Sequence, residues 1–507
     1  MPFQQILPWK PSDDLGKGLE MAMPLAYRLN DPKLFTELCY IGGQWVGAIN
    51  SATFPVDNPA TGVVIGNVPQ CGAQETDDAI AAADRAFQIW RKTTAGERGA
   101  LLERWFDLMI ENSDDLARIM TLEQGKPLAE ARGEITYGAS FVKWFAEEAR
   151  RVYGETIPAA TTDGRIIVQK HPIGVVAAIT PWNFPNAMIT RKAAPALAAG
   201  CTIVIKPAEA TPFSALALGV LAERAGIPKG VINILTGRAA DIGAALTRSP
   251  IVRKLTFTGS TRVGRLLMEQ CAATVKRVGL ELGGNAPFLI FDDADLDSAV
   301  SGVMASKFRN GGQTCVCANR ILVQDGVYDA FAKKLVAAAS KLVVGDGLAE
   351  GTTIGPMINQ AAIEKIQRHV DDAVAHGAAV VMGGKLRSGL FYEPTVLKEA
   401  TIDMKIAREE TFGPVAPLFR FSSEADAIAT SNDTPFGLAS YLYTRDISRA
   451  FRVAEALEFG MVGINASSVS TTAAPFGGIK QSGLGREGSH HGIEEFLEMK
   501  TLHIGGL

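Results

Sequence analysis

Apolar residues recur at helical spacing between residues 77 and 154, as in the series Ala83, Phe87 and Trp90. Few helix breakers interrupt this stretch, so the pattern predicts a helical layer. Beyond it, short apolar runs alternate with helical segments, and the runs lie at residues 175–180, 202–206, 231–235 and 254–258. Such continuous runs are typical of strands buried on both faces of a parallel sheet. The alternation therefore predicts βαβ units, whose ligands bind at the carboxyl ends of the strands.

The alternation of strand and helix patterns restarts after Glu281-Leu-Gly-Gly284. An apolar run at 288–291, a helical segment at 296–308 and a further run at 320–323 predict a second α/β domain. The glycine-rich stretch 476–488 is followed by a polar tail that has no core of its own. We expect this tail to dock on another part of the fold or on another subunit.

The charged side chains nearly cancel, with 50 Lys and Arg against 54 Asp and Glu. No single-sign field is available to hold a nucleic acid or an anionic membrane surface. The apolar runs end at charged residues such as Lys206 and Glu223, well short of the roughly 18 residues that a membrane span needs. The composition therefore predicts no nucleic-acid or membrane partner and favours a small-molecule ligand.

Six cysteines in so long a chain are too few for a disulfide scaffold, and they favour a reducing, cytoplasmic setting. Cys315 and Cys317 lack the second ligand pair of a structural zinc site, so we predict no metal. Residues 1–33 form an N-terminal extension without the basic start and apolar stretch of a signal peptide. This extension is an ordered arm, a loose tail or an upstream segment with translation starting at Met21 or Met23.

Cys315 stands where a helical segment gives way to a glycine pair and then to a strand. An isolated cysteine is most often a small buried hydrophobe. The polar approach Gly311-Gly-Gln-Thr314 instead favours a partly exposed thiolate near backbone N–H groups, which is what an activated nucleophile requires.

Glu281 and Asn183 are polar residues near the ends of predicted strands. Glu281 lies in apolar sequence, where burial would raise its pKa toward that of a general base; the alternative is a salt-bridged carboxylate at a domain boundary. Asn183, in Pro181-Trp-Asn-Phe-Pro185, offers an amide donor to a developing oxyanion, or it belongs to a proline-framed turn.

Two other strand ends carry groups that suit a dinucleotide. Gly259 and Ser260 precede a helix, where free N–H groups bind a phosphate or where Ser260 is an ordinary helix cap. Lys206 and Glu209 end the second strand and are placed to hold ribose hydroxyls, although a solvated ion pair is the commoner meaning of such a pair.

Together these segments resemble the aldehyde dehydrogenase superfamily. From about residue 34 to 507 the chain is most similar to the succinate-semialdehyde dehydrogenase branch, and glutarate-semialdehyde dehydrogenase is also similar. Six motifs occur in the family's order, too many for chance: Trp182-Asn-Phe-Pro, Phe257-Thr-Gly-Ser-Thr, Glu281-Leu-Gly-Gly, Gly312-Gln-Thr-Cys315, Glu410-Thr-Phe412-Gly-Pro and Pro475-Phe-Gly-Gly478.

The resemblance implies an α/β fold in three parts and a homodimer or homotetramer. A parallel-sheet, Rossmann-like cofactor domain would comprise residues 34–149 and 172–284. A second α/β domain, the catalytic domain, would comprise 285–484. A small oligomerisation arm would comprise 150–171 and 485–507.

The resemblance also implies roles for individual residues. Cys315 would be the nucleophile, Asn183 and the Cys315 backbone N–H would hold the oxyanion, and Glu281 would activate water for hydrolysis of a thioester. Lys192 and Glu487 match polar positions with a structural or proton-relay role. The residues implied to bind the NAD(P) cofactor are Trp182, Lys206, Glu209, Gly259, Ser260, Glu410 and Phe412.

Glu209 departs from bacterial relatives of the succinate-semialdehyde branch, which often have Lys-Pro-Ala-Ser at this point. A carboxylate accepts a hydrogen bond from a ribose 2′-hydroxyl but repels a 2′-phosphate, so we predict that NAD is preferred over NADP.

Arg191 and Arg309 stand beside the motifs proposed to be catalytic. Burying an unpaired arginine costs free energy, which suggests that the two arginines bind an anionic ligand. The resemblance implies that both bind the distal carboxylate of a semialdehyde together with Ser470. The alternative is that both are paired with protein carboxylates. The loop 465–474 departs from the relatives' loop, so the sequence leaves the depth of the pocket open. A longer acid such as glutarate semialdehyde, or a 2-oxo acid semialdehyde, would use the same arginines.

Cys317 lies two residues beyond the predicted nucleophile. The commoner reading of a second thiol is core packing. The alternative, which relatives with this Cys-x-Cys arrangement suggest, is a redox switch through an easily reduced disulfide with Cys315.

Three hypotheses follow from the sequence. The leading one is a hydrolytic, NAD-preferring dehydrogenase of a carboxylated semialdehyde. The second keeps the chemistry but assigns a neutral aliphatic, hydroxy or aromatic aldehyde. The third, a binding or structural protein with this fold, is disfavoured because Cys315, Glu281 and Asn183 are all present.

Overall fold

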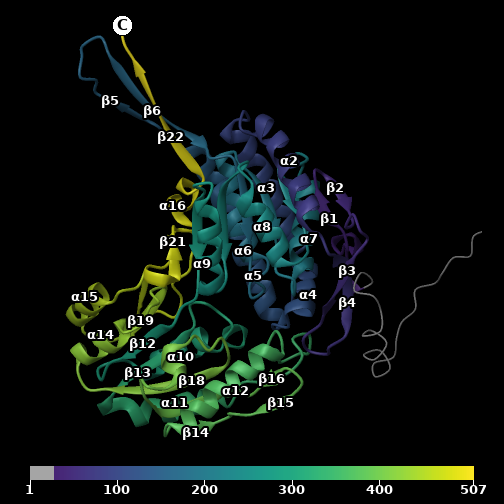
Figure 1. Cartoon of the computed structure of the whole chain (residues 1–507). Helices are drawn as coiled ribbons and strands as arrows, with labels where there is room; N and C mark the ends of the chain where they lie inside the picture. The colour runs from purple at the N-terminus through teal and green to yellow at the C-terminus, as the bar shows by residue number, and fades with distance from the viewer. Residues whose placement is uncertain (1–27) are drawn as a thin grey trace, which may run out of the picture.

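A computed structural model describes residues 28–507 of the protein (Figure 1). Most of the predicted extension, residues 1–27, lies outside the described residues. The described part of that extension is tied to the rest of the fold, because Asp31 accepts from Arg224 and the backbone N–H groups of Asn30 and Asp31 donate to Asp115. No helix within residues 28–507 is long and apolar enough to cross a membrane.

The first large sheet contains all four strands that the apolar runs predict. Its five central strands run parallel, and antiparallel strands flank them at both edges. The order across the sheet is β2 (Gln44–Val46), β1 (Cys39–Ile41), β9 (Ile232–Ile234), β8 (Thr202–Lys206), β7 (Val175–Ile179), β10 (Val252–Thr258), β11 (Arg277–Glu281) and β21 (Gly483–Leu484).

Helices cover both faces of this sheet, as the continuous apolar runs require. In β7 the side chains of Val176 and Ala178 pack into one hydrophobic core, and those of Val175, Ala177 and Ile179 pack into another on the opposite face. The first core is shared with α3 (Ala95–Glu111), α4 (Ser113–Gln124), α5 (Leu128–Glu148), α6 (Ala187–Ala199) and α7 (Pro212–Arg224), and the second with α2 (Ala73–Trp90), α8 (Ala239–Arg248) and α9 (Thr261–Ala272).

The second large sheet confirms the second α/β unit. The order across it is β14 (Ala379–Met382), β17 (Thr395–Ala400), β18 (Val415–Phe421), β13 (Ala318–Gln324), β12 (Ala286–Ile290), β19 (Ala439–Tyr443) and β20 (Met461–Ile464). Only β14 is antiparallel to its neighbour. The helices on its two faces are α10 (Leu296–Lys307) and α11 (Tyr328–Ala339) on one, and α12 (Gln360–Ala375), α13 (Lys405–Arg408), α14 (Glu424–Asn432) and α15 (Ile447–Ala456) on the other.

A three-stranded antiparallel sheet projects from the body of the molecule (Figure 1). The C-terminal strand β22 (Leu497–Ile504) pairs with β6 (Arg165–Pro172), and β6 pairs with β5 (Glu155–Ile157). The polar tail therefore docks on an element far away in the sequence, after the short helix α16 (Ser489–Glu494). Two small hairpins complete the strands, β3 (Thr53–Asp57) with β4 (Val64–Pro69) and β15 (Leu386–Ser388) with β16 (Phe391–Tyr392). The domain boundaries given above remain predictions.

Candidate active site

Cys315 lies at the end of a tight loop that begins with the 3-10 turn Arg309–Gly312. Asn310, Gly311 and Gly312 have φ angles of 50°, 61° and 78°, so the chain turns through the left-handed region three times in succession. Glycine is required at 312, because a Cβ there would lie 2.2 Å from the carbonyl oxygen of Gly413. The loop brings the partly exposed Cys315 to a cavity of about 330 Å³, called the front pocket below.

Burial raises the pKa of the Cys315 thiol to about 12, and the nearby charges of Glu410 and Glu281 add to this effect. The charges of Arg191 and Arg309 act in the opposite direction. The partial exposure expected from sequence is present. The resting group is nevertheless a protonated thiol at neutral pH, because the apolar surroundings outweigh the two arginines.

Asn183 follows β7, and its loop lies against the Cys315 loop. Its side-chain Nδ2 donates to the backbone oxygen of Gln313 at 2.9 Å. An amide nitrogen carries two hydrogens, so the second N–H is free to donate to a reacting group. The backbone oxygen of Asn183 accepts from Lys126 Nζ at 2.7 Å and from Asn310 Nδ2 at 3.0 Å.

The front pocket brings together Cys315 and all three residues that sequence assigns to substrate binding, Arg191, Arg309 and Ser470. Tyr137 joins two of them, because its hydroxyl shares a hydrogen bond with Ser470 Oγ and accepts from Arg191 Nη1 at 3.2 Å. The other lining residues are Lys126, Glu130, Gly133, Glu134, Phe184, Met188, Thr314, Val316, Ser468 and Phe476.

The idea that both arginines are buried and unpaired is wrong. Arg191 is buried, but its Nη2 lies 2.8 Å from Glu487 Oε2 and its guanidinium lies over the ring of Phe476. Arg309 is exposed, lies over the ring of Phe184 and has no carboxylate within ion-pair distance among the described residues. One arginine is thus already neutralised by the protein, and the other presents a charge to the pocket.

Glu281 lines a much smaller cavity of about 20 Å³ behind Arg191, called the rear cavity below. Its Oε2 is buried and finds no hydrogen-bond partner in the described part of the chain. Burial raises the pKa of Glu281 well above its usual value, and the charge of Glu487 raises it further, against Arg191 and Lys192. A buried carboxyl with a raised pKa and a free oxygen is the arrangement expected of a general base.

Glu487 connects Glu281 to the buried cations. It pairs with Arg191 and with Lys192, whose Nζ also donates to Thr258 Oγ1 at 2.6 Å. Burial alone would raise the pKa of Glu487, but the charges of Lys192 and Arg191 hold it below its usual value. Glu487 is therefore ionised beside a Glu281 that favours its neutral form.

The residues predicted to bind the nicotinamide end of a cofactor lie between the two sheets. The ring of Trp182 meets the ring of Phe412 edge-on, with 5.6 Å between centroids. Glu410 Oε1 accepts from the backbone N–H of Gly284 at 3.1 Å, and burial raises the pKa of Glu410 to about 7. Phe412 has a φ of 57°, a strained conformation for a non-glycine residue that is more often found at functional sites.

The residues predicted to bind the adenosine end lie along the same sheet edge, after β8 and β10. Lys206 Nζ lies 2.8 Å from Glu209 Oε1, which also accepts from the first N–H of α8 at Ala239. Ser260 caps α9, following Gly259, and the first turn of a helix leaves N–H groups available to an anion. This donor set fits a dinucleotide.

Cys317 is fully buried and does not line the front pocket. Its thiol accepts from Lys307 Nζ at 3.3 Å. Burial raises the pKa of Cys317.

Three residues that line the front pocket were missed from sequence: Tyr137 and the buried pair Lys126 and Glu134. Glu134 and Tyr137 are polar residues of α5, which otherwise buries an apolar face, and Lys126 lies in the corner just before this helix. Their distance in sequence from Asn183 and Cys315 hid their role.

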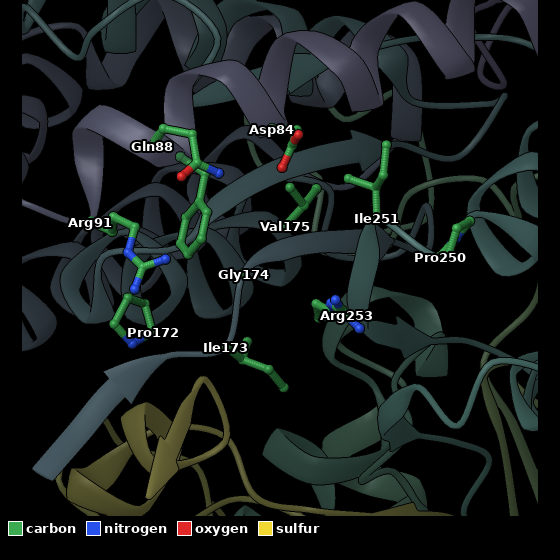
Figure 2. Close-up of a pocket in the computed structure, with 11 residues that line it drawn as sticks. Asp84, Gln88, Arg91, Pro172, Ile173, Gly174, Val175, Pro250, Ile251 and Arg253 are labelled. Carbon is green, nitrogen blue, oxygen red and sulfur yellow. The ribbon is translucent and has the colours of Figure 1, made fainter. Parts of the chain in front are cut away.

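A further cavity, of about 520 Å³, lies at the opposite end of the first sheet (Figure 2). Val175 at the start of β7 forms part of its lining, and Arg91 and Arg253 lie at its sides. Ligands of parallel sheets bind at the carboxyl ends of strands, so this cavity is at the wrong end for the catalytic ligand.

Comparison with known proteins gives a consistent result. Residues 45–502 match the description "Aldehyde dehydrogenase family". The chain is 65% identical over 477 residues to a glutarate-semialdehyde dehydrogenase of Pseudomonas putida, covering 94% of this chain and 99% of that protein. It is 62% identical over 480 residues to the succinate-semialdehyde dehydrogenase [NADP(+)] GabD of Escherichia coli, covering 94% and 100%. A crystal structure of an aldehyde dehydrogenase from Brucella melitensis biovar abortus 2308 superposes with a TM-score of 0.94 at 60% identity, covering 94% and 99%.

Proposed function

Because this chain belongs to the aldehyde dehydrogenase family, we propose that it oxidises a carboxylated semialdehyde, succinate or glutarate semialdehyde, to the dicarboxylate. One observation carries this assignment. The front pocket that holds Cys315 also holds the guanidinium of Arg309, which is exposed and has no ion-pair partner within residues 28–507. A planar guanidinium binds a carboxylate through two hydrogen bonds, so it suits the distal end of such a substrate.

The distal carboxylate would bind Arg309, with Arg191 and the hydroxyls of Tyr137 and Ser470 at the side of the same pocket. Cys315 would then give its proton to water in the front pocket, and its sulfur would form a bond to the aldehyde carbon as the carbonyl π bond breaks toward oxygen. The second N–H of Asn183 and the backbone N–H of Cys315 would stabilise the charge that develops on oxygen. When bound, NAD(P) accepts the hydride that leaves this carbon, and a thioester on Cys315 remains.

Hydrolysis would use a water molecule that binds Glu281 Oε2, the buried oxygen that has no hydrogen-bond partner in the described part of the chain. Glu281, in its ionised form, would take a proton from this water as the water oxygen attacks the thioester carbon. The carbon–sulfur bond then breaks, the acid leaves, and the sulfur regains its proton. The negative charge of the neighbouring Glu487 makes Glu281 a stronger base for this step, because it raises the pKa of Glu281.

NAD is the preferred cofactor in this proposal, in contrast to the NADP(+) named for the E. coli relative. Glu209 is held by Lys206 and by the N-terminus of α8, so its carboxylate cannot easily move aside. A 2′-phosphate would meet this negative charge, whereas a 2′-hydroxyl can donate to it. The ratio of kcat/KM for NAD to that for NADP tests this, and Glu209→Ser should shift it toward NADP. Higher efficiency with NADP in the native protein would reject the preference.

We also propose a homodimer or homotetramer in a reducing, cytoplasmic compartment. The projecting sheet carries exposed apolar side chains, among them Ile157, Met499 and Ile504, which a second subunit would cover. All six cysteines are unpaired. Light scattering on the purified protein measures the assembly, and a monomer at micromolar concentration would contradict this part.

The substrate assignment is tested by steady-state NADH formation with matched pairs of aldehydes. Glutarate semialdehyde is compared with pentanal, and succinate semialdehyde with butanal, because each pair has equal chain length and differs in the distal carboxylate. We expect kcat/KM to be at least about tenfold higher for the charged member, the effect of one charge-assisted hydrogen bond. Equal efficiency within both pairs would reject the proposal in favour of a neutral aldehyde.

A further inference from the structure

Four polar side chains at the corner between α4 and α5 contact the two loops that carry Asn183 and Cys315. They belong to Gln124, Lys126, Glu130 and Glu134. The corner lies more than fifty residues before either loop in sequence. The nearest charged pair is Lys126 with Glu134, whose side chains are each 1% exposed and lie 2.5 Å apart. A buried ion pair is poor evidence of stabilisation, because its desolvation offsets its attraction. Its retention requires another explanation.

The pair holds the Asn183 loop at both ends. Lys126 Nζ donates to the backbone oxygen of Asn183 at 2.7 Å. Glu134 Oε1 accepts from the backbone N–H groups of Asn186 at 3.0 Å and Ala187 at 3.2 Å, which open α6. The four residues from Asn183 to Asn186 are therefore fixed by opposite charges at their start and their end.

Two further residues of the corner hold the nucleophile loop to the same point. Glu130 accepts from the backbone N–H of Asn310 at 2.7 Å, and Gln124 donates to Asn310 Oδ1 at 3.0 Å. Asn310 in turn donates to the backbone oxygen of Asn183 at 3.0 Å, beside Lys126. This oxygen is thus the point at which the two loops and the corner meet.

Close packing leaves the loop little room to relax. Gly138, one turn beyond Glu134 on α5, permits the approach, because a Cβ at 138 would lie 2.3 Å from Asn186 Oδ1. The left-handed conformation of Asn310 needs support from its surroundings, and Glu130 and Gln124 supply it.

We propose that the buried Lys126–Glu134 pair is the positioning device of the oxyanion site: it sets where the Asn183 amide points relative to Cys315, and it acts on catalysis only through that amide. This inference rests on the proposed acyl chemistry at Cys315. It is independent of which aldehyde is the substrate, since the pair acts on the carbonyl end of the reaction.

A double-mutant cycle tests the claim that the pair acts through Asn183. The first change is Lys126→Met with Glu134→Gln, which removes both charges together and avoids an unpaired buried ion. The second is Asn183→Ala. The readout is the rate of the first-turnover NADH burst, because it follows attack by Cys315 and precedes hydrolysis. It is measured with glutarate semialdehyde and with pentanal.

We expect the neutral pair to slow the burst by about 10²-fold, as loss of one oxyanion donor does. In the Asn183→Ala background the same change should slow it by less than about twofold, since the amide to be positioned is gone. Equal losses in both backgrounds would overturn the proposal. If the semialdehyde is not oxidised at all but the coupling persists with pentanal, the substrate proposal fails and the positioning role stands.

Two measurements separate positioning from other effects. The charges that act most strongly on the pKa of Cys315 are Glu410, Glu281, Arg191 and Arg309, and the neutral pair keeps all four, so the pH dependence of alkylation of Cys315 by iodoacetamide should be unchanged. Glu123→Gln is the matched control, because Glu123 is an equally buried carboxylate on α4 that holds the N-terminus of α7 instead. The burst rate of Glu123→Gln should equal that of the native enzyme. Its thermal stability should be similar to that of the variant with both Lys126→Met and Glu134→Gln. A comparable slowing in this control would show a general packing effect and reject the proposal.

Discussion

The front pocket and the rear cavity lie on either side of Arg191, and they leave different groups unsatisfied. In the front pocket the unsatisfied group is the cation Arg309. In the rear cavity Arg191 and Lys254 have ion-pair partners, and Glu281 is the lining carboxylate that has none among the described residues and whose Oε2 also accepts no hydrogen bond there. Unsatisfied groups are costly, so the difference indicates what each space is built to receive: an anion in front and a proton donor such as water behind.

Replacing Glu281 with Gln should have the largest effect, because it removes the carboxylate of the rear cavity that makes no ion pair with any described residue. We expect hydrolysis of the thioester to slow by about 10²–10⁴-fold while the first-turnover NADH burst persists. Quenched-flow kinetics with mass spectrometry of Cys315 measures both. Loss of the burst together with turnover would mean that Glu281 also acts on the reaction in the front pocket. This result would reject the assignment of Glu281 to hydrolysis alone.

Replacing Arg191 with Ala should damage both spaces, because this residue lines both. Glu487 would lose one of its two partners within the fold, so we expect the free energy of unfolding to fall by about 3–5 kcal/mol. The KM for a semialdehyde should also rise. Urea denaturation and steady-state kinetics report the two effects. A variant with normal stability and only a raised KM would place Arg191 in the front pocket alone.

Replacing Arg309 with Ala should affect the front pocket alone. Loss of one charge-assisted hydrogen bond, about 1.5–3 kcal/mol, should raise KM for glutarate semialdehyde by roughly 10- to 150-fold. The KM for pentanal should change little, and so should stability, because Arg309 is exposed. An equal rise for both aldehydes would show that Arg309 shapes the pocket and does not bind a carboxylate.

The pH profile tests the rear cavity without mutation. Glu281 acts in its ionised form, and its pKa is raised by burial and by Glu487. The rate of thioester hydrolysis should therefore increase with pH through a limb that lies above the ordinary pKa of glutamate, about 4.3, with a tenfold gain per pH unit below its midpoint. A rate that is flat from pH 5 upward would show that Glu281 is already ionised at acidic pH.

Four strands of the first sheet and two of the second could be predicted, because buried parallel strands carry continuous apolar runs. At β8 the bounds of the strand match the predicted run, which ends at Lys206. The gathering of Cys315, Arg309 and Ser470 also followed from motifs. The pairing of Arg191 with Glu487 could not be read from sequence, since nearly 300 residues separate them. Lys126, Glu134 and Tyr137 were not assigned to the site from sequence for the same reason. Their roles depend on contacts between segments far apart in the chain, which periodicity does not encode.

Ser470 offers the finest test of the front pocket. Its hydroxyl shares a hydrogen bond with Tyr137, which also binds Arg191, so the three form one polar wall of the pocket that Arg309 also lines. Ser470→Ala removes one neutral hydrogen bond, worth about 0.5–1.5 kcal/mol, and should raise KM for glutarate semialdehyde by roughly 2- to 13-fold with unchanged kcat. Tyr137→Phe is the matched change, because it removes the other half of the same bond. If the two effects are not additive in the double variant, the wall acts as a unit on the carboxylate, whereas additive effects would mean that Ser470 and Tyr137 contact the substrate separately.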